Sequence, residues 1–376
     1  MNRSEIAEIR RRFNAERNGI TSVRGCYVNE KKEIVASFER PLQTFPQEEK
    51  EKYLALMRRT LSGIPGKNLV DVAFSNQEVM EGDAHRLLMN LKDSGLKDEA
   101  LVQQLFQKII DSLVIEDHYL ILMMHDVYDV PYRATDGAKL EDASQEVFSY
   151  ILVSICPVKL TKPALSYNAF DKEFHSRNSD WVVTAPEMGF LFPSFDERAS
   201  NIYNALYYTK DTENQHDELA EALFHSPLPM PAALQKETFQ SILADTLAED
   251  CSMEVVQAVH EQVCSLIEER KQDKTAPQAA VSQREVKAVL ESCGVKEEHV
   301  AAFAQQFDDA FGSGMTVNAQ NIINDKKFEV RTADVVIQVN PARSDLVETR
   351  TIDGFRYILI RAEDEVSVNG VPITIK

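Results

Sequence analysis

The stretch HYLILMMHDVYDV, residues 118–130, is the densest apolar run in the chain and decides its fold. A second run, VFSYILVSICPV at residues 147–158, follows after a polar segment. Both runs are short, rich in β-branched and aromatic residues, and bounded by residues that favour turns, which is typical of buried strands. They therefore predict the core of a sheet. Further buried strands are predicted at WVV (181–183), GFLFP (189–193) and ALYYTK (205–210).

The residues before this sheet core predict helices and one hairpin. Apolar spacings of three and four mark the helices, and apolar-polar alternation marks the hairpin. The predicted elements are, in order, a helix over 5–13 with Ser4 as N-cap, a hairpin over 22–40, a helix over 47–62, a strand over 68–74 and two helical segments within 84–113, broken at 93–95. The two last helical segments are expected to cover one face of the sheet.

The residues after the sheet core predict more helices and then a β-rich end. Asp353-Gly354 and Asn369-Gly370 connect strand-like runs there, and such pairs are the strongest local signal for a hairpin turn. The end of the chain is therefore predicted to be a small antiparallel meander. The predicted helices are 215–224, 232–248, 252–270, 283–292 and 297–311, with a linker at 272–280.

These elements predict an α+β protein: a mixed α/β N-terminal part, an acidic helical middle, and a C-terminal antiparallel β-meander preceded by two short helices. A chain of 376 residues is long for one core, so several domains are expected. The predicted division is an α/β domain with a central sheet over 1–211, a helical segment over 212–271 packed on it or extending from it, a linker over 272–282 and a helix-plus-β domain over 283–376.

Composition limits the class of protein. With 44% hydrophobic and 27% charged residues the chain is globular, and no apolar run reaches the roughly 18–20 residues of a membrane helix. The five cysteines, Cys26, Cys156, Cys251, Cys264 and Cys293, show neither CxxC pairs nor zinc spacing. This pattern indicates thiols in a reducing compartment. We therefore expect a cytoplasmic protein that has no membrane contact, no metal and no cofactor.

Charge is spread unevenly along the chain. The net charge of −19 argues against general nucleic-acid binding, yet residues 1–70 carry 14 Lys and Arg against nine Asp and Glu. This asymmetry permits a basic N-terminal face. The consecutive arginines Arg10, Arg11 and Arg12 could equally lie on a solvated face of their helix. If the protein contacts nucleic acid, the predicted residues are Arg10, Arg11, Arg12, Arg17, Arg24, Lys31, Lys32, Arg58 and Arg59.

An enzymatic alternative rests on polar groups in and after the apolar strands. His125 and Asp126 could supply a general base with an orienting carboxylate, and Ser154 or Cys156 a nucleophile. His175 and Asp180, in a segment over 171–198 expected to be a loop, could complete a hydrolase-type site. No nucleophile elbow or cysteine-protease motif surrounds these residues. His and Cys on apolar strands are more often satisfied core residues.

Two motifs resemble ligand-binding loops but lack the required spacing. Gly63 and Gly66-Lys67 stand two residues apart rather than four, and Asn68 replaces the Ser or Thr of a phosphate loop, so we interpret this stretch as a helix stop and turn. The segment 131–145 is acidic but lacks the residue pattern of a calcium loop. It is expected to be a solvated loop.

The helical middle is strongly acidic. Residues 211–271 carry 13 Asp and Glu against three Lys and Arg. Such a surface would repel a phosphate backbone. A third hypothesis is therefore that this surface docks a basic protein partner or mimics a nucleic acid.

Several phrases are similar to those of a bacterial protein family catalogued only as a domain of unknown function. This resemblance covers essentially the whole chain and implies family membership, but it carries over no catalytic or binding residue. The phrases are YDVP (128–131), SICPV (154–158), LSYN (165–168), GFLFP (189–193), LYYTK (206–210), QKETFQ (235–240) and VNPARSDLVETRTIDG (339–354).

More distantly, the chain resembles the bacterial nucleoid-associated protein family. The likeness lies in the order of parts, from an apolar two-strand centre through a long helix and a linker to a final β segment, EVSVNGVPITI. It implies association with the nucleoid and with DNA-acting enzymes. The leading hypothesis is therefore a non-enzymatic cytoplasmic binding or adaptor protein with a protein partner, and homo-oligomerisation stays open.

Overall fold

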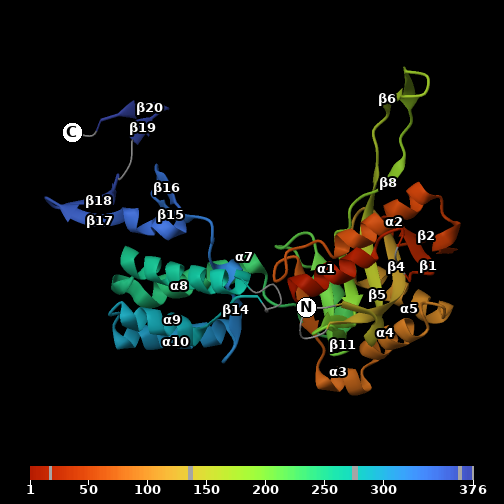
Figure 1. Ribbon diagram of the computed structural model, residues 1–376, viewed down its shortest axis with the longest axis horizontal. Coiled ribbons are helices and arrows are strands. Elements are labelled where there is room, and N and C mark those ends of the chain that lie inside the picture. Colours follow the sequence, from red (N-terminus) through yellow and green to blue (C-terminus); the bar gives the residue numbers. More distant parts are fainter. Residues whose placement is uncertain (17–18, 134–138, 273–277, 363–365, 375–376) are drawn as a thin grey trace. The chain divides into compact units, whose positions relative to one another are not determined.

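The structure is a computed structural model that describes residues 1–16, 19–133, 139–272, 278–362 and 366–374, and the side chains of these residues outside 132–145. The predicted α+β class is confirmed (Figure 1). The chain divides into two compact units, Met1–Pro231 and Ala232–Lys376. Among the described helices, none has the length and apolar character needed to cross a bilayer.

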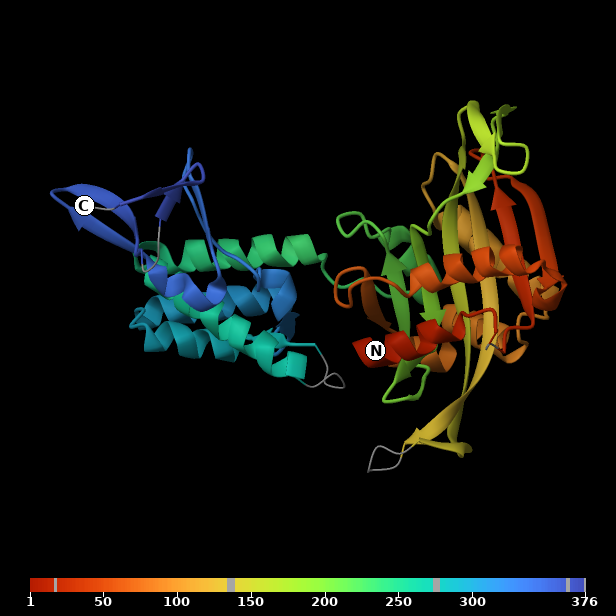
Figure 2. The same ribbon diagram turned by 45° about the horizontal axis from the view of Figure 1, so that its top comes forward.

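An antiparallel sheet forms the centre of the first unit (Figures 1 and 2). Its order is β2-β1-β4-β5-β9-β12-β3, and β8 pairs with β5. The two apolar runs form β4 and β5, which pair with each other along their length. The strands are β1 Ser22–Val28, β2 Ile34–Pro41, β3 Leu69–Ala73, β4 His118–Arg133, β5 Lys139–Leu160, β8 Trp181–Val183, β9 Met188–Phe192 and β12 Asn204–Thr209.

Helices cover both faces of this sheet. Side chains alternate along β4, so that Ile121 and Met123 join a core formed with α4, α5 and α6, whereas Leu122 and Met124 join a core formed with α1 and α2. Burial on both faces explains why β4 is a continuous apolar run. The helices of this unit are α1 Arg3–Arg12, η1 Leu42–Thr44, α2 Gln47–Thr60, α3 Asn76–Glu81, α4 Asp83–Asp93, α5 Glu99–Ser112 and α6 Asp217–Phe224.

The N-cap of α1 is Asn2, so the prediction of Ser4 was wrong. The Asn2 side chain accepts hydrogen bonds from the backbone N–H of Ser4 and of Glu5. In return, the Glu5 carboxylate accepts a hydrogen bond from the Asn2 backbone N–H. This reciprocal capping box satisfies several otherwise unpaired donors, and it starts the helix earlier than Ser4 would.

Two predicted loops of the first unit contain strands. β4 continues to Arg133 and β5 begins at Lys139, so the expected solvated loop over 131–145 is mostly strand, and its residues 134–138 lie outside the described part. The expectation of a loop over 171–198 was also wrong, whereas the strands predicted within it at 181–183 and 189–193 are present as β8 and β9. Apolar and polar residues alternate in this region as they do in strands. The strands inside it, beside β8 and β9, are β7 Glu173–Arg177 and β10 Ser194–Asp196. They pair with β6 Ala164–Asn168 and β11 Ala199–Asn201, which lie on either side of it.

In the second unit, five of the described helices, α7 to α11, contribute to a separate core. Phe239, Val263 and Phe303 lie in it. The apolar residues that recur at helical spacing in 232–248 and 252–270 are buried there, except that Leu266 is partly buried and Val256 is exposed. These two helices share a unit with the C-terminal helices, because the chain divides into its two compact units after Pro231. The helices are α7 Ala232–Leu247, η2 Ala248–Asp250, α8 Met253–Gln272, α9 Gln283–Ser292, α10 Glu297–Phe311, α11 Ala319–Ile322 and η3 Pro341–Leu346.

The antiparallel strands predicted for the C-terminal end are present, and in the described residues they form separate two-stranded pairs. The helix η3 separates the second pair from the third, and most residues of the last two pairs are exposed. The turns at Asp353-Gly354 and Asn369-Gly370 are confirmed, with positive φ at all four residues. The pairs are β13 Ala280–Ser282 with β14 Thr316–Asn318, β15 Phe328–Arg331 with β16 Val336–Val339, β17 Val347–Ile352 with β18 Phe355–Ile360, and β19 Val366–Val368 with β20 Val371–Ile373.

Candidate functional site

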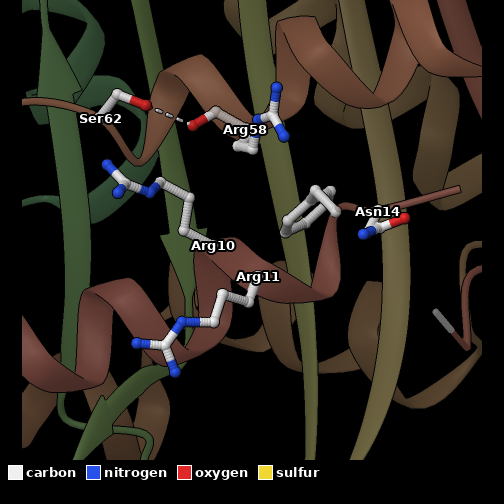
Figure 3. A pocket seen from close by; sticks show the side chains of 6 residues that line it. Arg10, Arg11, Asn14, Arg58 and Ser62 are labelled. Carbon is white, nitrogen blue, oxygen red and sulfur yellow. Dashed lines mark hydrogen bonds between the residues drawn. The ribbon is translucent and has the colours of Figure 1, made fainter. Parts of the chain in front are cut away.

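An open pocket lies between the C-terminal ends of α1 and α2 (Figure 3). Its volume is about 500 Å³, which is within the range of small-molecule sites. Half of its lining residues are arginines, which favours an anionic ligand. The lining residues are Arg10, Arg11, Phe13, Asn14, Arg58 and Ser62.

Helix α1 brings two of these arginines to the pocket. Ile6 and Ile9 are buried against the sheet, and Phe13, the C-cap residue, is buried behind them. Successive residues of a helix turn by about 100°. The side chains of Arg10 and Arg11 therefore point away from the buried side of the helix and are exposed. In Figure 3 the Arg10 side chain extends toward Ser62.

Helix α2 brings the third arginine. Met57 is buried and Arg58 is exposed. Thr60, the last residue of α2, is fully buried, and its hydroxyl lies 2.6 Å from that of Ser154 on β5. This contact holds the end of α2 on the sheet and so fixes the position of Arg58.

The three pocket arginines carry uncompensated charge. Arg10, Arg11 and Arg58 are exposed, and none of them makes an ion pair or side-chain hydrogen bond with any residue in the described part of the chain. The Ser62 hydroxyl, in contrast, donates to the backbone carbonyl of Arg58 (Figure 3). Free guanidinium groups can bind phosphate or carboxylate oxygens bidentately. The pocket is therefore suited to an anion.

The other predicted basic residues do not join this pocket. Arg12 is paired with Asp126, and buried Arg24 is paired with Glu39 and Glu99. Lys31 and Lys32 are exposed at the turn between β1 and β2. Arg59 is exposed on α2 without lining the pocket, and Arg17 lies outside the described residues. Of the eight residues of this set that the structure describes, Arg10, Arg11 and Arg58 line the pocket.

Sequence reasoning missed the uncharged pocket residues, Phe13, Asn14 and Ser62. Phe13 lies at the end of the predicted helix over 5–13, and this buried residue also lines the pocket. Asn14 and Ser62 follow the ends of α1 and α2, and no motif in the sequence marks them as neighbours.

The proposed catalytic pair His125 and Asp126 is not brought together. The imidazole Nε2 lies 2.9 Å from the Ser149 hydroxyl on the helix α4 side of the sheet, where Gly95 approaches it. The Asp126 carboxylate is buried on the opposite side and binds Arg12, Tyr150 and the backbone N–H of Gly19. Adjacent strand residues point to opposite faces. His125 and Asp126 therefore cannot act as one acid–base pair in this arrangement.

The remaining candidates of the enzymatic alternative also lie apart. The His175 imidazole lies 2.6 Å from the Asp171 carboxylate on the exposed hairpin β6–β7, and Asp180 follows that hairpin. Ser154 is buried against Thr60. Burial raises the pKa of the Cys156 thiol to about 12, with a further contribution from Glu187, so that thiol is not an activated nucleophile. No described contact joins these groups to His125.

His125 leads to a prediction about pH. Burial lowers the pKa of His125 below its ordinary 6.5, although the Asp126 charge opposes this shift. The unfolded chain therefore takes up the proton first, and His125 destabilises the fold as pH falls below about 6.5. Urea unfolding followed by Trp181 fluorescence should show a larger loss of stability between roughly pH 7.5 and 5.5 in the parent chain than in His125→Gln. Equal losses would contradict this account.

The described residues contain no group of three or more His, Cys, Asp or Glu side chains that could hold a metal. The five cysteines are free. Burial raises the pKa of the Cys26 thiol and of the Cys264 thiol to about 11. At neutral pH these two thiols are therefore protonated and unreactive.

Comparison with known proteins places the chain in a family. A family model described as "Domain of unknown function (DUF4317)" matches residues 1–371. No curated protein matches the chain. The resemblance to a family catalogued only as a domain of unknown function is thus confirmed, whereas the resemblance to the nucleoid-associated family finds no support. Since the match spans nearly all of its length, the chain belongs to the family described as Domain of unknown function (DUF4317).

Proposed function

We propose that this protein is a binding protein whose first unit holds a compact, phosphate-bearing ligand in the pocket between α1 and α2. The observation that supports the proposal is the set of three exposed arginines, Arg10, Arg11 and Arg58, that line the pocket and have no ion-pair partner among the described residues. Arginine binds phosphate oxygens in a fixed fork geometry. A phosphate group would therefore fit the chemistry of these side chains.

The charge distribution favours a compact ligand over a long nucleic acid. The chain has a net charge of −19, and Arg12 and Arg24 are already engaged in ion pairs. A long phosphate backbone would meet repulsion beyond the pocket. The aromatic residue that lines the pocket, Phe13, is only 2% exposed and so offers little surface on which a base could stack.

A structural role for the same arginines has to be weighed against binding. Both α1 and α2 end at the pocket, and the end of a helix carries roughly half a negative charge, which cations stabilise. Two such ends amount to about one negative charge, which is less than the charge of three guanidinium groups. The pocket therefore stays positive overall, and an anion is still attracted.

The test is a titration of the full chain with three probes at fixed salt: pyrophosphate, a nucleoside triphosphate and a short single-stranded oligonucleotide. The parent should bind at least one of the first two. The double variant Arg10→Ala with Arg58→Ala should weaken that binding by about 100-fold, because each charge-assisted hydrogen bond contributes roughly 1.5–3 kcal/mol.

The matched control is Lys31→Ala with Lys32→Ala, which removes two exposed positive charges of the first unit without touching the pocket. It should leave the affinity nearly unchanged. No binding of any probe, or an equal loss in the control, would sink the proposal. Affinity that grows with oligonucleotide length would favour a nucleic-acid ligand instead.

A further inference from the structure

The hairpin β6–β7 projects from the sheet of the first unit (Figures 1 and 2). In the described part of the chain, its two strands pair only with each other. Every residue of both strands is exposed. A two-stranded hairpin is only marginally stable by itself, whereas three or more strands with a common apolar face are stable. The hairpin therefore lacks strands that would stabilise it.

Its two faces differ in chemistry. The register pairs Tyr167 with Phe174 and Leu165 with Ser176, which places these four residues on one face. The rings of Tyr167 and Phe174 are in contact, and Leu165 is 72% exposed. The opposite face is polar. The hairpin is thus an amphipathic ribbon whose apolar face is uncovered.

The tip of the hairpin is held in place by its own hydrogen bonds. Asn168 accepts from the Phe170 backbone N–H and donates to the Asp171 carboxylate, which also lies 2.6 Å from the His175 imidazole. Lys172, with positive φ, donates its backbone N–H to the carbonyl of Asn168. These contacts fix the shape of the hairpin. The outer edges of β6 and β7 pair with no other described strand, so each could pair with an added strand.

Strand β7 has a charge pattern that is complementary to itself. Its sequence is EFHSR, with Glu173 at one end, His175 in the middle and Arg177 at the other end. Glu173 and Arg177 lie on the same face, and neither side chain makes an ion pair with any described residue. If two copies of this strand paired antiparallel about His175, each Glu173 would stand opposite the Arg177 of the other copy. Opposite charges directly across a strand pair are stabilising.

We propose that β7 pairs antiparallel with β7 of a second copy of this chain. The pairing makes a four-stranded sheet, β6-β7-β7-β6, with two cross-strand ion pairs on its polar face. A two-fold axis through the His175 pair keeps the two apolar faces on the same side, so the Tyr167 and Phe174 pairs become one continuous surface. This strand addition gives hydrogen-bond partners to the backbone groups at the outer edge of β7. It also makes a sheet of four strands, which is more stable than an isolated two-stranded hairpin.

Charge also argues against a lipid surface as the occupant. In the hairpin, Asp171 and Glu173 are balanced by Lys172 and Arg177, so it has no net positive charge, and the chain as a whole carries −19. Anionic membrane surfaces attract segments with an excess of basic residues, which this hairpin does not have. An unrelated protein edge could add to β7, but it would have no reason to carry the reciprocal Glu and Arg at the same spacing. The second copy is the partner that the strand itself specifies.

The test is analytical ultracentrifugation of the full chain from micromolar to sub-millimolar concentration. The parent should form a dimer. Glu173→Arg and Arg177→Glu should each weaken the dimer at least about tenfold, because two attractive pairs become repulsive. Asp180→Arg makes the same charge change as Glu173→Arg just outside the hairpin, and it should leave the dimer unchanged.

Two recovery experiments make the test specific to the antiparallel register. The double variant Glu173→Arg with Arg177→Glu restores the pairing and should dimerise within about threefold of the parent. An equimolar mixture of the two single variants should form a heterodimer, because an all-basic β7 then faces an all-acidic one. A parent that stays monomeric, a dimer insensitive to both reversals, or a double variant that fails to recover would each overturn the proposal. Binding of the parent to anionic vesicles that Phe174→Glu abolishes, without any dimer, would also overturn it.

Discussion

The substitution Arg12→Ala is expected to lower the unfolding free energy of the first unit by about 3 kcal/mol, the lower end of the range for breaking a buried ion pair. Arg12 forms two parallel hydrogen bonds with the Asp126 carboxylate, of 2.9 and 3.0 Å. Asp126 is 1% exposed, whereas Arg12 is 21% exposed. Removal of Arg12 would leave a buried carboxylate without its counter-charge.

The surroundings of this pair add to the expected loss. Burial alone would lower the pKa of Arg12, but the hydrogen bonds and charge of Asp126 outweigh it and raise that pKa. Burial, together with the Asp126 charge, raises the pKa of Tyr150, whose hydroxyl donates to Asp126. The guanidinium of Arg12 also lies over the ring of Tyr128, 4.8 Å from its centroid. The substitution would disturb all of these contacts.

The measurement is urea unfolding followed by fluorescence of Trp181, the single tryptophan, which lies in the first unit. Arg11→Ala is the matched control. It removes an adjacent arginine of the same helix, but Arg11 is exposed and has no ion-pair partner among the described residues. The control should change stability by less than about 0.5 kcal/mol. Similar losses in both variants would mean that the Arg12–Asp126 pair is not what anchors α1.

The substitution Gly189→Ala is expected to cost about 2–3 kcal/mol through overpacking. A Cβ at Gly189, on β9, would lie 2.3 Å from the carbonyl oxygen of Val153 and 2.6 Å from the Thr60 methyl group. The first atom belongs to the backbone of the neighbouring strand and cannot move without disturbing the ladder. The second belongs to the end of α2. The methyl group would therefore push α2 off the sheet and displace Arg58 from the pocket.

Gly25→Ala provides the comparison. A Cβ there would also be too close to its neighbours, at 2.2 Å, but those atoms belong to the outer edge of the Phe38 ring on β2. Phe38 is half-buried on the edge strand of the sheet, so its ring can rotate away. Urea unfolding should show a loss well below that of Gly189→Ala. If Gly25→Ala were the more damaging of the two, the close approach of α2 to β9 would not be the dominant constraint.

The candidate pocket could be predicted from the sequence only in part. The stripe of Ile6, Ile9 and Phe13 defines the buried side of α1, and from this stripe one can infer that Arg10 is exposed. Arg58 was recognised as basic, but its place beside Arg10 depends on where α2 crosses the sheet. Helical periodicity describes one helix at a time, so it does not indicate which side chains of two helices share a pocket.

What the sequence by itself determined was local: the apolar runs of β4 and β5, the two helical stripes of 232–248 and 252–270, and the turns at Asp353-Gly354 and Asn369-Gly370. Each depends on periodicity or on backbone preferences over a few residues. Only the tertiary structure decided that Arg12 meets Asp126, 114 positions away, and that His125 faces the opposite side of the sheet. The physical reason is that such pairs are set by strand register and helix packing, which bring together residues that are distant in the sequence.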